Sequence, residues 1–341
     1  MTQCGSGTLA SVRLRFLTCV VLVGCGFRSQ ATGSAGAIPD DASLDGVAAR
    51  DGAVDSPPSQ GTGCWPHWYD HNPVLSTPAR IDELSSTGPD RDPWLSEDGK
   101  RIYFAHQAPG GTSDIYFASR ASTSVPFGTP AKIVELSTTT AQEGRPALSR
   151  DELTLVLSSD ISNQFDVRIS VRPDVVTPFG SPDTRMMGNV NTSMTQHYDP
   201  FLTGDGLNLY LAPKPNNPQN SPQHIYVASR AALGDNFGPP SKLPVVNSTG
   251  AGDGDADPSV SLDQRVLLFS SDRGNAGNDT DLYYATRAGA TGNFSTPIAL
   301  SAVNGAALEG DPMLSADGCD LYFASNRTSG DYDLYVSHVT P

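Results

Sequence analysis

A unit of roughly 55 residues recurs five times along this chain of 341 residues. Each copy contains one proline in the same context, and successive copies are separated by 53, 54, 58 and 54 residues. An aspartate follows the proline after five residues, and Ile or Leu follows it after nine. Because a unit of this length cannot bury an apolar face alone, the copies must stack on one another. The repeated prolines are Pro93, Pro146, Pro200, Pro258 and Pro312.

Each unit predicts four short antiparallel strands. In the first unit the expected strands cover residues 92–96, 101–105, 114–120 and 130–136. Glu97-Asp98-Gly99 between the first two is a hairpin signal. The strands are rich in Leu, Tyr and Phe and lack helical periodicity, which is typical of a propeller blade. A linear solenoid of stacked repeats is the alternative.

The two ends of the repeat region favour a closed ring over a solenoid. The last unit stops at Pro341, after its third expected strand. Residues 75–84 (LSTPARIDEL) nearly repeat residues 127–136 (FGTPAKIVEL), which form a fourth strand. We therefore expect an all-β, five-bladed propeller in which an N-terminal strand completes the last blade and leaves no open repeat. The expected blades cover residues 88–140, 141–193, 194–250, 251–306, and 307–341 together with 72–86.

The repeat resembles a known family. Residues 311–325 (DPMLSADGCDLYFAS) look like the WD40-like β-propeller repeat of the TolB type. The resemblance covers residues 68–341 and is weakest in the second unit, where Arg145 and Glu152 replace an Asp and a Gly. Proteins with this repeat often have six blades, so the count of five rests on the present sequence.

The N-terminal region predicts export. Arg13 and Arg15 precede the apolar run 16–23 and then Gly24-Cys25, so residues 1–25 read as a secretory signal. Residues 22–25 (LVGC) resemble a bacterial lipobox, which implies lipid modification of Cys25; ordinary signal cleavage is the alternative. Residues 26–63 are dominated by small and polar residues and read as a flexible linker to the propeller at 64–341. We expect a membrane-anchored lipoprotein facing the periplasm or the cell exterior.

The net charge of the chain limits the classes of partner that it is expected to bind. The chain has 37 acidic and 22 basic residues, and loss of Arg13 and Arg15 with the signal would leave a net charge of −17. A nucleic-acid ligand is therefore not expected, because phosphate neutralisation requires a basic surface. Cations, cationic partners and neutral sugars fit better.

Carboxylates recur just before the repeated prolines. If the first strand of each blade is nearest the axis, these residues surround the mouth of the central channel, where they would attract a cation or a basic side chain. The structural alternative is that each Asp caps a turn or pairs with an arginine such as Arg120, Arg230 or Arg287. The predicted axial ring consists of Asp90, Asp92, Glu143, Arg145, His197, Asp199, Asp255, Asp257, Glu309 and Asp311.

Two weaker metal hypotheses arise elsewhere. Asp272, Asp279 and Asp281, with Asn275 and Asn278, supply oxygen ligands that suit calcium, although their spacing is not that of an EF-hand. Residues 64–71 contain Cys64, His67, Asp70 and His71, a set that could bind zinc. A disulfide between Cys64 and Cys319 is the competing expectation, because both cysteines would lie in an oxidising compartment on the same face.

No nucleophile elbow, metalloprotease helix or phosphate loop occurs in the sequence. The first hypothesis is therefore a non-catalytic, monomeric envelope protein that binds another protein or a polysaccharide through its acidic axial face. The alternative is a glycoside hydrolase, in which Asp92, Asp199 or Asp257 would act with Glu309 as paired carboxylates in an axial funnel. Tyr198 is the aromatic candidate for contact with a sugar.

Overall fold

The computed structural model describes residues 63–340, apart from 193–194, 217–221, 251–252, 275–278 and 329. The expected signal, Cys25 and nearly all of the linker lie outside the described residues. Within the described part of the chain, no helix has the length and apolar character needed to cross a bilayer.

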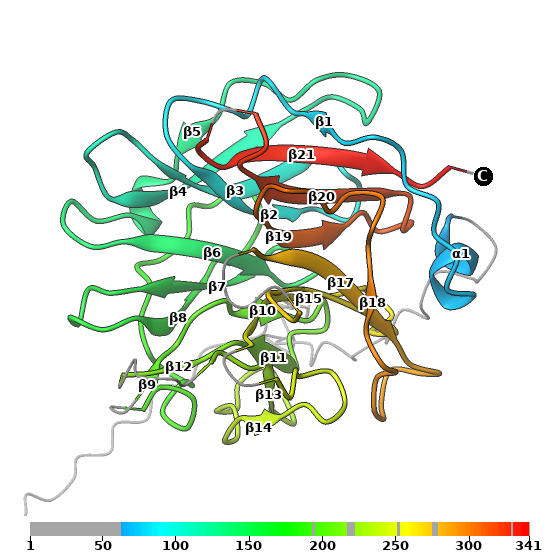
Figure 1. Ribbon diagram of the computed structural model, residues 1–341. Coiled ribbons are helices and arrows are strands. Elements are labelled where there is room, and N and C mark those ends of the chain that lie inside the picture. The colour runs from blue at the N-terminus through cyan, green and yellow to red at the C-terminus, as the bar shows by residue number, and fades with distance from the viewer. Residues whose placement is uncertain are drawn as a thin grey trace, which may run out of the picture. The chain divides into compact units, whose positions relative to one another are not determined.

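The chain forms a five-bladed β-propeller, as the repeat predicts (Figure 1). Blade 1 contains β2 (Asp90–Leu95), β3 (Arg101–Gln107), β4 (Ser113–Ser119) and β5 (Ala131–Lys132). Blade 2 contains β6 (Glu143–Leu148), β7 (Thr154–Ser159) and β8 (Asp166–Val171). Blade 3 contains β10 (Phe201–Leu202), β11 (Asn208–Leu211), β13 (Tyr226–Ser229) and β14 (Ser241–Lys242). Blade 4 contains β15 (Asp255–Val260), β16 (Val266–Ser271), β17 (Asp281–Thr286) and β18 (Ile298–Ala299).

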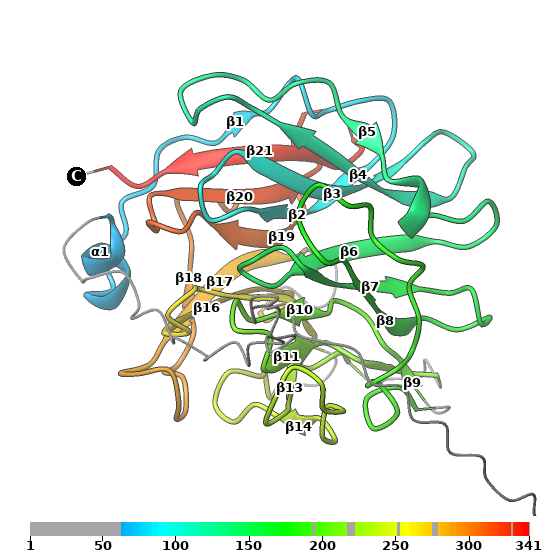
Figure 2. The ribbon, with the colours of Figure 1, turned by 180° about the vertical axis from the view of Figure 1, so that it is seen from behind.

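Blade 5 is closed by the N-terminal segment. It combines β19 (Glu309–Leu314), β20 (Asp320–Ser325) and β21 (Asp333–His338) with β1 (Ala79–Arg80). β1 runs antiparallel to β21, with Ala79 opposite Val336. Both ribbon views place these two strands side by side (Figures 1 and 2). The last strand of the chain, β21, is therefore paired on both sides, with β20 and with β1, and the ring is closed by the N-terminal segment.

Blade 2 departs from the predicted four strands. Its fourth strand is reduced to a single bridge between Ile169 and Asp183. The Asp183 carboxylate accepts hydrogen bonds from the backbone N–H and the Nε of Arg185, at 2.9 and 3.0 Å. The Asp183 carboxylate thus takes the backbone N–H of Arg185, which would otherwise continue the hydrogen-bonded pairing with β8. The chain therefore leaves the sheet after a single pair of residues. Beyond the prediction, β9 (Thr195–Gln196) and β12 (Lys214–Pro215) form a separate two-stranded ribbon.

The turn between the first two strands explains the unusual residue of blade 2. Glu152 takes the place of glycine at a positive φ of 57°. Its carboxylate accepts hydrogen bonds from Arg101 of blade 1, including one of 2.6 Å from a terminal guanidinium nitrogen. Gln264, the corresponding residue of blade 4, also has a positive φ and accepts a 3.2 Å bond from Asn208 of blade 3. A larger residue in this strained position thus joins neighbouring blades.

Arginines at the ends of the third strands link blades on the hairpin face rather than at the axis. Arg120 lies over Phe127, with its guanidinium carbon 4.2 Å from the ring centroid. Its Nε donates to the carbonyl of Gly99 at 2.7 Å, and a terminal nitrogen donates to Tyr322 of blade 5 at 3.2 Å. Arg230 and Arg287 also stack on phenylalanine and donate to turn carbonyls. The expectation that these arginines pair with the axial aspartates is therefore wrong.

The last blade has no arginine at this position, and a short helix takes over part of its role. The helix α1 (Trp65–Tyr69) places Trp68, which is fully buried, against blade 5. Its indole Nε1 donates to the carbonyl of Gly318 at 2.8 Å, the turn carbonyl that corresponds to Gly99. The preceding residue, Cys64, forms a disulfide with Cys319. Because the Cys64 sulfur is bonded to another sulfur, it cannot serve as the thiolate of a zinc site.

Candidate functional site

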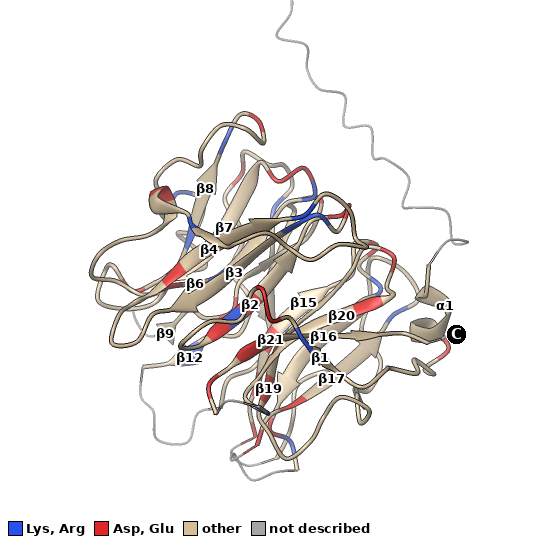
Figure 3. Cartoon of the chain, turned by 90° about the horizontal axis from the view of Figure 1, so that it is seen from above, with Lys and Arg blue, Asp and Glu red and all other residues tan. Residues whose placement is uncertain are grey.

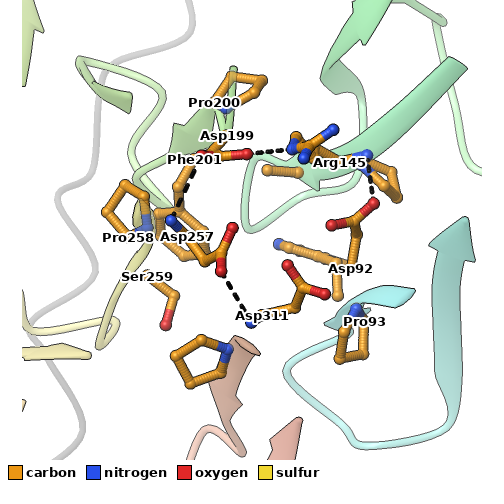
Figure 4. Close-up of a pocket in the computed structure, with 14 residues that line it drawn as sticks. Asp92, Pro93, Arg145, Asp199, Pro200, Phe201, Asp257, Pro258, Ser259 and Asp311 are labelled. Atoms are coloured by element: carbon orange, nitrogen blue, oxygen red, sulfur yellow. Dashed lines mark hydrogen bonds and ion pairs between the residues drawn. The ribbon is translucent and has the colours of Figure 1, made fainter. Parts of the chain in front are cut away.

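The residue before each repeated proline lines a cavity on the propeller axis. Figure 4 shows these five side chains around one opening. All five have a positive φ, between 53° and 58°, although none is glycine. In four of the blades the register of the first strand pair shifts across this residue and its proline, as in a β-bulge. Positive φ is better tolerated by Asp than by most residues, and the ring consists of Asp92, Arg145, Asp199, Asp257 and Asp311.

Hydrogen bonds run around this axial ring from blade to blade. The Asp92 carboxylate accepts the backbone N–H of Arg145 at 3.1 Å. The Asp257 carboxylate accepts the backbone N–H of Asp311 at 3.4 Å and the hydroxyl of Ser270 at 2.5 Å. The Arg145 side chain donates to Asp199. Each of these three aspartates is therefore used in holding the ring together.

The ring concentrates negative charge, since four carboxylates face one guanidinium. Burial raises the pKa of Asp199 to about 7, because the carboxylates of Asp257 and Asp92 add to the effect and Arg145 only partly offsets it. Burial also raises the pKa of Asp311 well above its usual value, with Asp92 and Asp257 contributing. Burial alone would lower the pKa of Arg145, but the surrounding carboxylates raise it. The axial ring thus contains more acidic groups than its one guanidinium can neutralise.

The axial cavity is small. Its volume is about 40 Å³, which suffices for two or three water molecules, since one needs roughly 10–15 Å³ of such space. Ser259 lies in its wall, and its hydroxyl is buried with no hydrogen-bond partner among the described residues. The cavity therefore suits water or a single small cationic group and is too small for a sugar ring.

The other half of the predicted ring lies elsewhere. The residues three before each proline are buried within their own blades and fix the connection from the preceding blade. Asp90 and Asp255 accept the backbone N–H groups of Ser86 and Ser248, at 2.8 and 2.7 Å. Glu143 and Glu309 accept those of Thr138 and Gly305 in the same way. His197 replaces the carboxylate in blade 3, where its Nε2 accepts the N–H of Thr192 at 3.2 Å.

None of these five residues lines the axial cavity, although Glu143 lines the larger cavity between blades 1 and 2. Burial raises the pKa of Glu143 and of Glu309, against the hydrogen bonds that stabilise the ionised forms. Burial lowers the pKa of His197, which suits its role as an acceptor. The expectation that all ten residues converge on one opening is therefore wrong for Asp90, Glu143, His197, Asp255 and Glu309.

A second cavity lies beside the ring, between blades 1 and 2. Its volume is about 300 Å³, and the residues of its walls include two cationic and two acidic ones, Arg91, Asp92, Glu143 and Arg145, together with Gln107, Gln142 and Phe165. Asp92 also lines the axial cavity, so the two spaces share a carboxylate. Sequence reasoning missed this cavity. Ser113 and Gly144 are both small, but Thr280 and Gly310 are small at the junction of blades 4 and 5 as well, so residue size alone does not single out this junction in the sequence.

The calcium hypothesis receives no support from the described residues. The Asp272 carboxylate accepts the N–H of Gly254, and burial raises the pKa of Asp272. Asn275 and Asn278 lie outside the described residues. Within the described part of the chain, no three His, Cys, Asp or Glu side chains are placed to hold a metal ion. Figure 3 shows charged residues of both signs spread over many strand ends and loops.

Comparison of the sequence with models of known protein families gave no match. Comparison with curated proteins gave none either. Among solved structures, a glycoside hydrolase shares the fold with a TM-score of 0.54 and 11% identity, over 79% of this chain and 90% of that one. A GH43_1 enzyme from Xanthomonas citri has a TM-score of 0.52 and 15% identity, over 78% and 91%. TolB from Acinetobacter baumannii has a TM-score of 0.45 and 16% identity, over 75% of this chain and 56% of its own.

The two hydrolases share the fold of this chain and nothing further follows from them, because identities this low show the fold alone. The protein belongs by its own sheets to the class of β-propellers. The blade count of five comes from the sheets themselves. The chain spans little more than half the length of the Acinetobacter TolB that it resembles.

Proposed function

We propose that this protein is a non-catalytic, lipid-anchored binding protein of the cell envelope. It recognises a protein or a surface polymer through the face that surrounds the axial ring. The signal-like segment 1–25 with Cys25 supports the location. The observation that carries the absence of catalysis is the size of the axial cavity, about 40 Å³.

The bonding within the ring supports the same proposal. A glycosidase places two free carboxyl groups on either side of the scissile bond, about 5–9.5 Å apart depending on mechanism. Here the carboxylates of Asp92 and Asp257 accept hydrogen bonds from the ring backbone. Asp199 pairs with Arg145. A sugar would have to break these contacts before reaching any of the three carboxylates.

The alternative is a glycoside hydrolase. One observation favours it specifically: the pKa of Asp199 is raised by burial to about 7, as the general acid of such an enzyme requires. Glu309, its suggested partner, is fully buried and bound by Arg327 and Ser325. The pairing of Asp199 with Glu309 through one substrate would therefore need a rearranged blade 5.

The first experiment compares partner capture from native envelope extract by residues 26–341 and by the variant Asp92→Asn/Asp257→Asn. The control is Glu97→Gln/Glu135→Gln, which removes the same charge from exposed positions outside the axial cavity. We expect a defined partner to be retained by the wild type and the control and lost by the ring variant. Equal capture by all three proteins would contradict recognition through the ring.

The second experiment tests hydrolysis of aryl glycosides and polysaccharides. We expect no turnover above the background of a heat-denatured sample. Turnover that disappears in Asp199→Asn, with fold retained by circular dichroism, would establish the enzyme alternative and overturn the non-catalytic proposal.

A further inference from the structure

The cavity between blades 1 and 2 is lined by hydrogen-bonding groups of every kind. Its walls hold two guanidinium groups, which only donate, two carboxylates, which accept when ionised, and two side-chain amides, which do both. The class of ligand that fits this cavity depends on which of these groups the protein already uses for itself.

The two acidic groups are used within the protein. The Glu143 carboxylate accepts the backbone N–H and the hydroxyl of Thr138 at 3.0 and 2.9 Å, and the hydroxyl of Ser159 at 3.2 Å. The Asp92 carboxylate accepts the backbone N–H of Arg145 at 3.1 Å. A cation in the cavity would have to compete with these donors, so the acidic groups do not favour a cationic ligand.

The two guanidinium groups face aspartates of the axial ring. Arg145 pairs with Asp199. The charge of Arg91 interacts with that of Asp311, and its guanidinium carbon lies 3.4 Å from the centroid of the Tyr332 ring. Because both cationic groups already have an opposite charge nearby, the cavity does not favour an anion either. The contact with Tyr332 also holds the Arg91 N–H groups in place, and these have no hydrogen-bond acceptor among the described residues.

The two glutamine amides are each held in one orientation. The Oε1 of Gln142 accepts the backbone N–H of Ser113 at 2.8 Å. The Nε2 of Gln107 donates to the carbonyl of Gly111 at 3.0 Å. A backbone N–H can only donate and a carbonyl can only accept, so these contacts fix which end of each amide remains for a ligand. Gln142 keeps its N–H donors, and Gln107 keeps its carbonyl oxygen.

A ligand that matches these groups is neutral and both donates and accepts hydrogen bonds at separate points. Gln107 needs a donor, whereas Gln142 and Arg91 need acceptors. The hydroxyls around a sugar ring do both, and Phe165 in the cavity wall offers an aromatic surface to the apolar face of such a ring. The volume of about 300 Å³ is at the lower end of the roughly 300–1,000 Å³ of ligand pockets, so the cavity suits a single sugar unit.

We propose that the cavity between blades 1 and 2 binds one unit of a neutral polysaccharide, whose hydroxyls donate to Gln107 and accept from Gln142 and Arg91. This inference rests on the proposed binding function and narrows its partner to a polymer of uncharged sugars. The sugar lies beside the axial ring, so Asp92 keeps its hydrogen bond to Arg145 and the ring stays intact.

The test is affinity electrophoresis of the protein in native gels that contain dextran, mannan, galactan or xylan, against a marker protein that binds none of them. Polygalacturonate serves as the anionic polymer. We expect at least one neutral polymer to retard the protein in a saturable manner. We expect no retardation by polygalacturonate, because its carboxylates are repelled by a strongly acidic chain.

The variant Gln107→Leu/Gln142→Leu should weaken this binding at least tenfold, because the sugar hydroxyls lose two hydrogen-bond partners. The matched control is Gln196→Leu. Gln196 stands four residues before its repeated proline, as Gln142 does, and accepts the backbone N–H of Phe165 at 2.6 Å, but it lies outside the cavity. It therefore reproduces the loss of a backbone contact without the loss of a cavity amide, and we expect it to change the affinity less than threefold.

Circular dichroism checks that each variant is folded. If the double variant unfolds, Gln107→Leu alone, which loses only an exposed hydrogen bond, should still weaken binding at least threefold. The inference would be overturned by wild-type protein that none of the four neutral polymers retards, by retardation in polygalacturonate alone, or by an equal loss in the cavity variant and Gln196→Leu. Capture of a protein partner without retardation by any neutral polymer would overturn the inference and leave the proposed function intact.

Discussion

At the scale of single residues, backbone strain and charge coincide on the axis. Five non-glycine residues hold positive φ angles before a proline. Such conformations cost free energy and persist where the surroundings fix them. Here the fixing contacts are the bonds from one ring residue to the next, such as Asp92 with Arg145. The carboxylates that recur before the prolines in the sequence therefore have two roles. They hold the ring residues of neighbouring blades together, and they give the channel its negative charge.

The first prediction at this scale concerns Asp311. Burial raises the pKa of the Asp311 carboxyl in the folded chain well above its ordinary value, so the unfolded chain loses this proton at lower pH than the folded chain does. The group's stabilising contribution is complete below the unfolded pKa and is lost as pH rises toward the folded pKa. We expect Asp311→Asn to gain stability relative to the wild type between about pH 4 and about pH 7. Urea unfolding at both pH values measures the difference, and Glu135→Gln, at an exposed position, is the control.

A pH-independent difference between Asp311→Asn and the wild type would show that Asp311 ionises equally easily in both states. The comparison between the two proteins cancels the titration of carboxylates remote from the ring, whereas Asp92 and Asp257 interact with Asp311 and are measured together with it.

The second prediction at this scale concerns Glu152. Glu152→Ala removes the ion pair with Arg101 and leaves a Cβ atom at a φ of 57°. We expect a loss of about 2–4 kcal/mol in the free energy of unfolding. Glu152→Gly loses the same pair but adopts this φ freely, so it should be roughly 1 kcal/mol more stable than Glu152→Ala. Chemical denaturation ranks the two variants, and the reverse order would contradict the explanation.

At the scale of secondary-structure elements, the helix α1 completes a repeated interaction with different chemistry. Arg120, Arg230 and Arg287 each donate a side-chain N–H to a turn carbonyl. Blade 5 has Val339 in the corresponding place, and Trp68 of α1 donates to Gly318 instead. The helix therefore supplies the hydrogen-bond donor that is missing in blade 5, the blade whose third strand lacks the arginine.

The prediction at this scale separates packing from hydrogen bonding. Trp68→Phe removes the indole N–H and should cost about 1–3 kcal/mol, because the Gly318 carbonyl loses its buried donor. Trp68→Ala should cost about 3–5 kcal/mol, because a cavity replaces a fully buried ring. Thermal and urea unfolding give both values. Equal stability of Trp68→Phe and the wild type would show that the hydrogen bond contributes nothing.

At the scale of the whole molecule, the ring is closed twice. β1 pairs with β21, and the disulfide joins Cys64 to Cys319 across 255 residues. The strand pair acts in the folded state, whereas the cross-link chiefly restricts the unfolded chain. The two devices are thus independent ways of favouring the closed ring.

The prediction at this scale is that Cys64→Ser/Cys319→Ser keeps the propeller but loses about 2–5 kcal/mol in the free energy of unfolding. The wild type should also migrate faster than this variant on a non-reducing gel and identically on a reducing gel. Equal unfolding midpoints of the variant and the oxidised wild type would mean that the cross-link does not contribute to stability.

The repeat by itself determined the fold class, the five blades and the closing strand. Spacing and strand pattern suffice for this, because each blade needs the same local turn and the same apolar alternation. The loss of the fourth strand in blade 2 was not foreseen, because the repeat pattern is the same there and only the hydrogen bond from the Arg185 N–H to the Asp183 carboxylate replaces the ladder. The helix α1 was equally hidden in a segment too short for periodicity.

The sequence predicted that ten residues surround the axis. Only the tertiary structure showed which of them line the axial cavity and which lie within the blades. Asp92, Arg145, Asp199, Asp257 and Asp311 line the cavity, while Glu143 and its counterparts turn into the blades. Residues two positions apart on a strand normally share a face, but the bulge at the ring breaks that rule. The cavity beside Asp92 likewise depends on two small residues, Ser113 and Gly144, that meet only when blades 1 and 2 pack together. The local sequence pattern determines the strands and turns of each blade. The shape of the cavities between blades depends on which side chains face one another where two blades pack together, and that requires the tertiary structure.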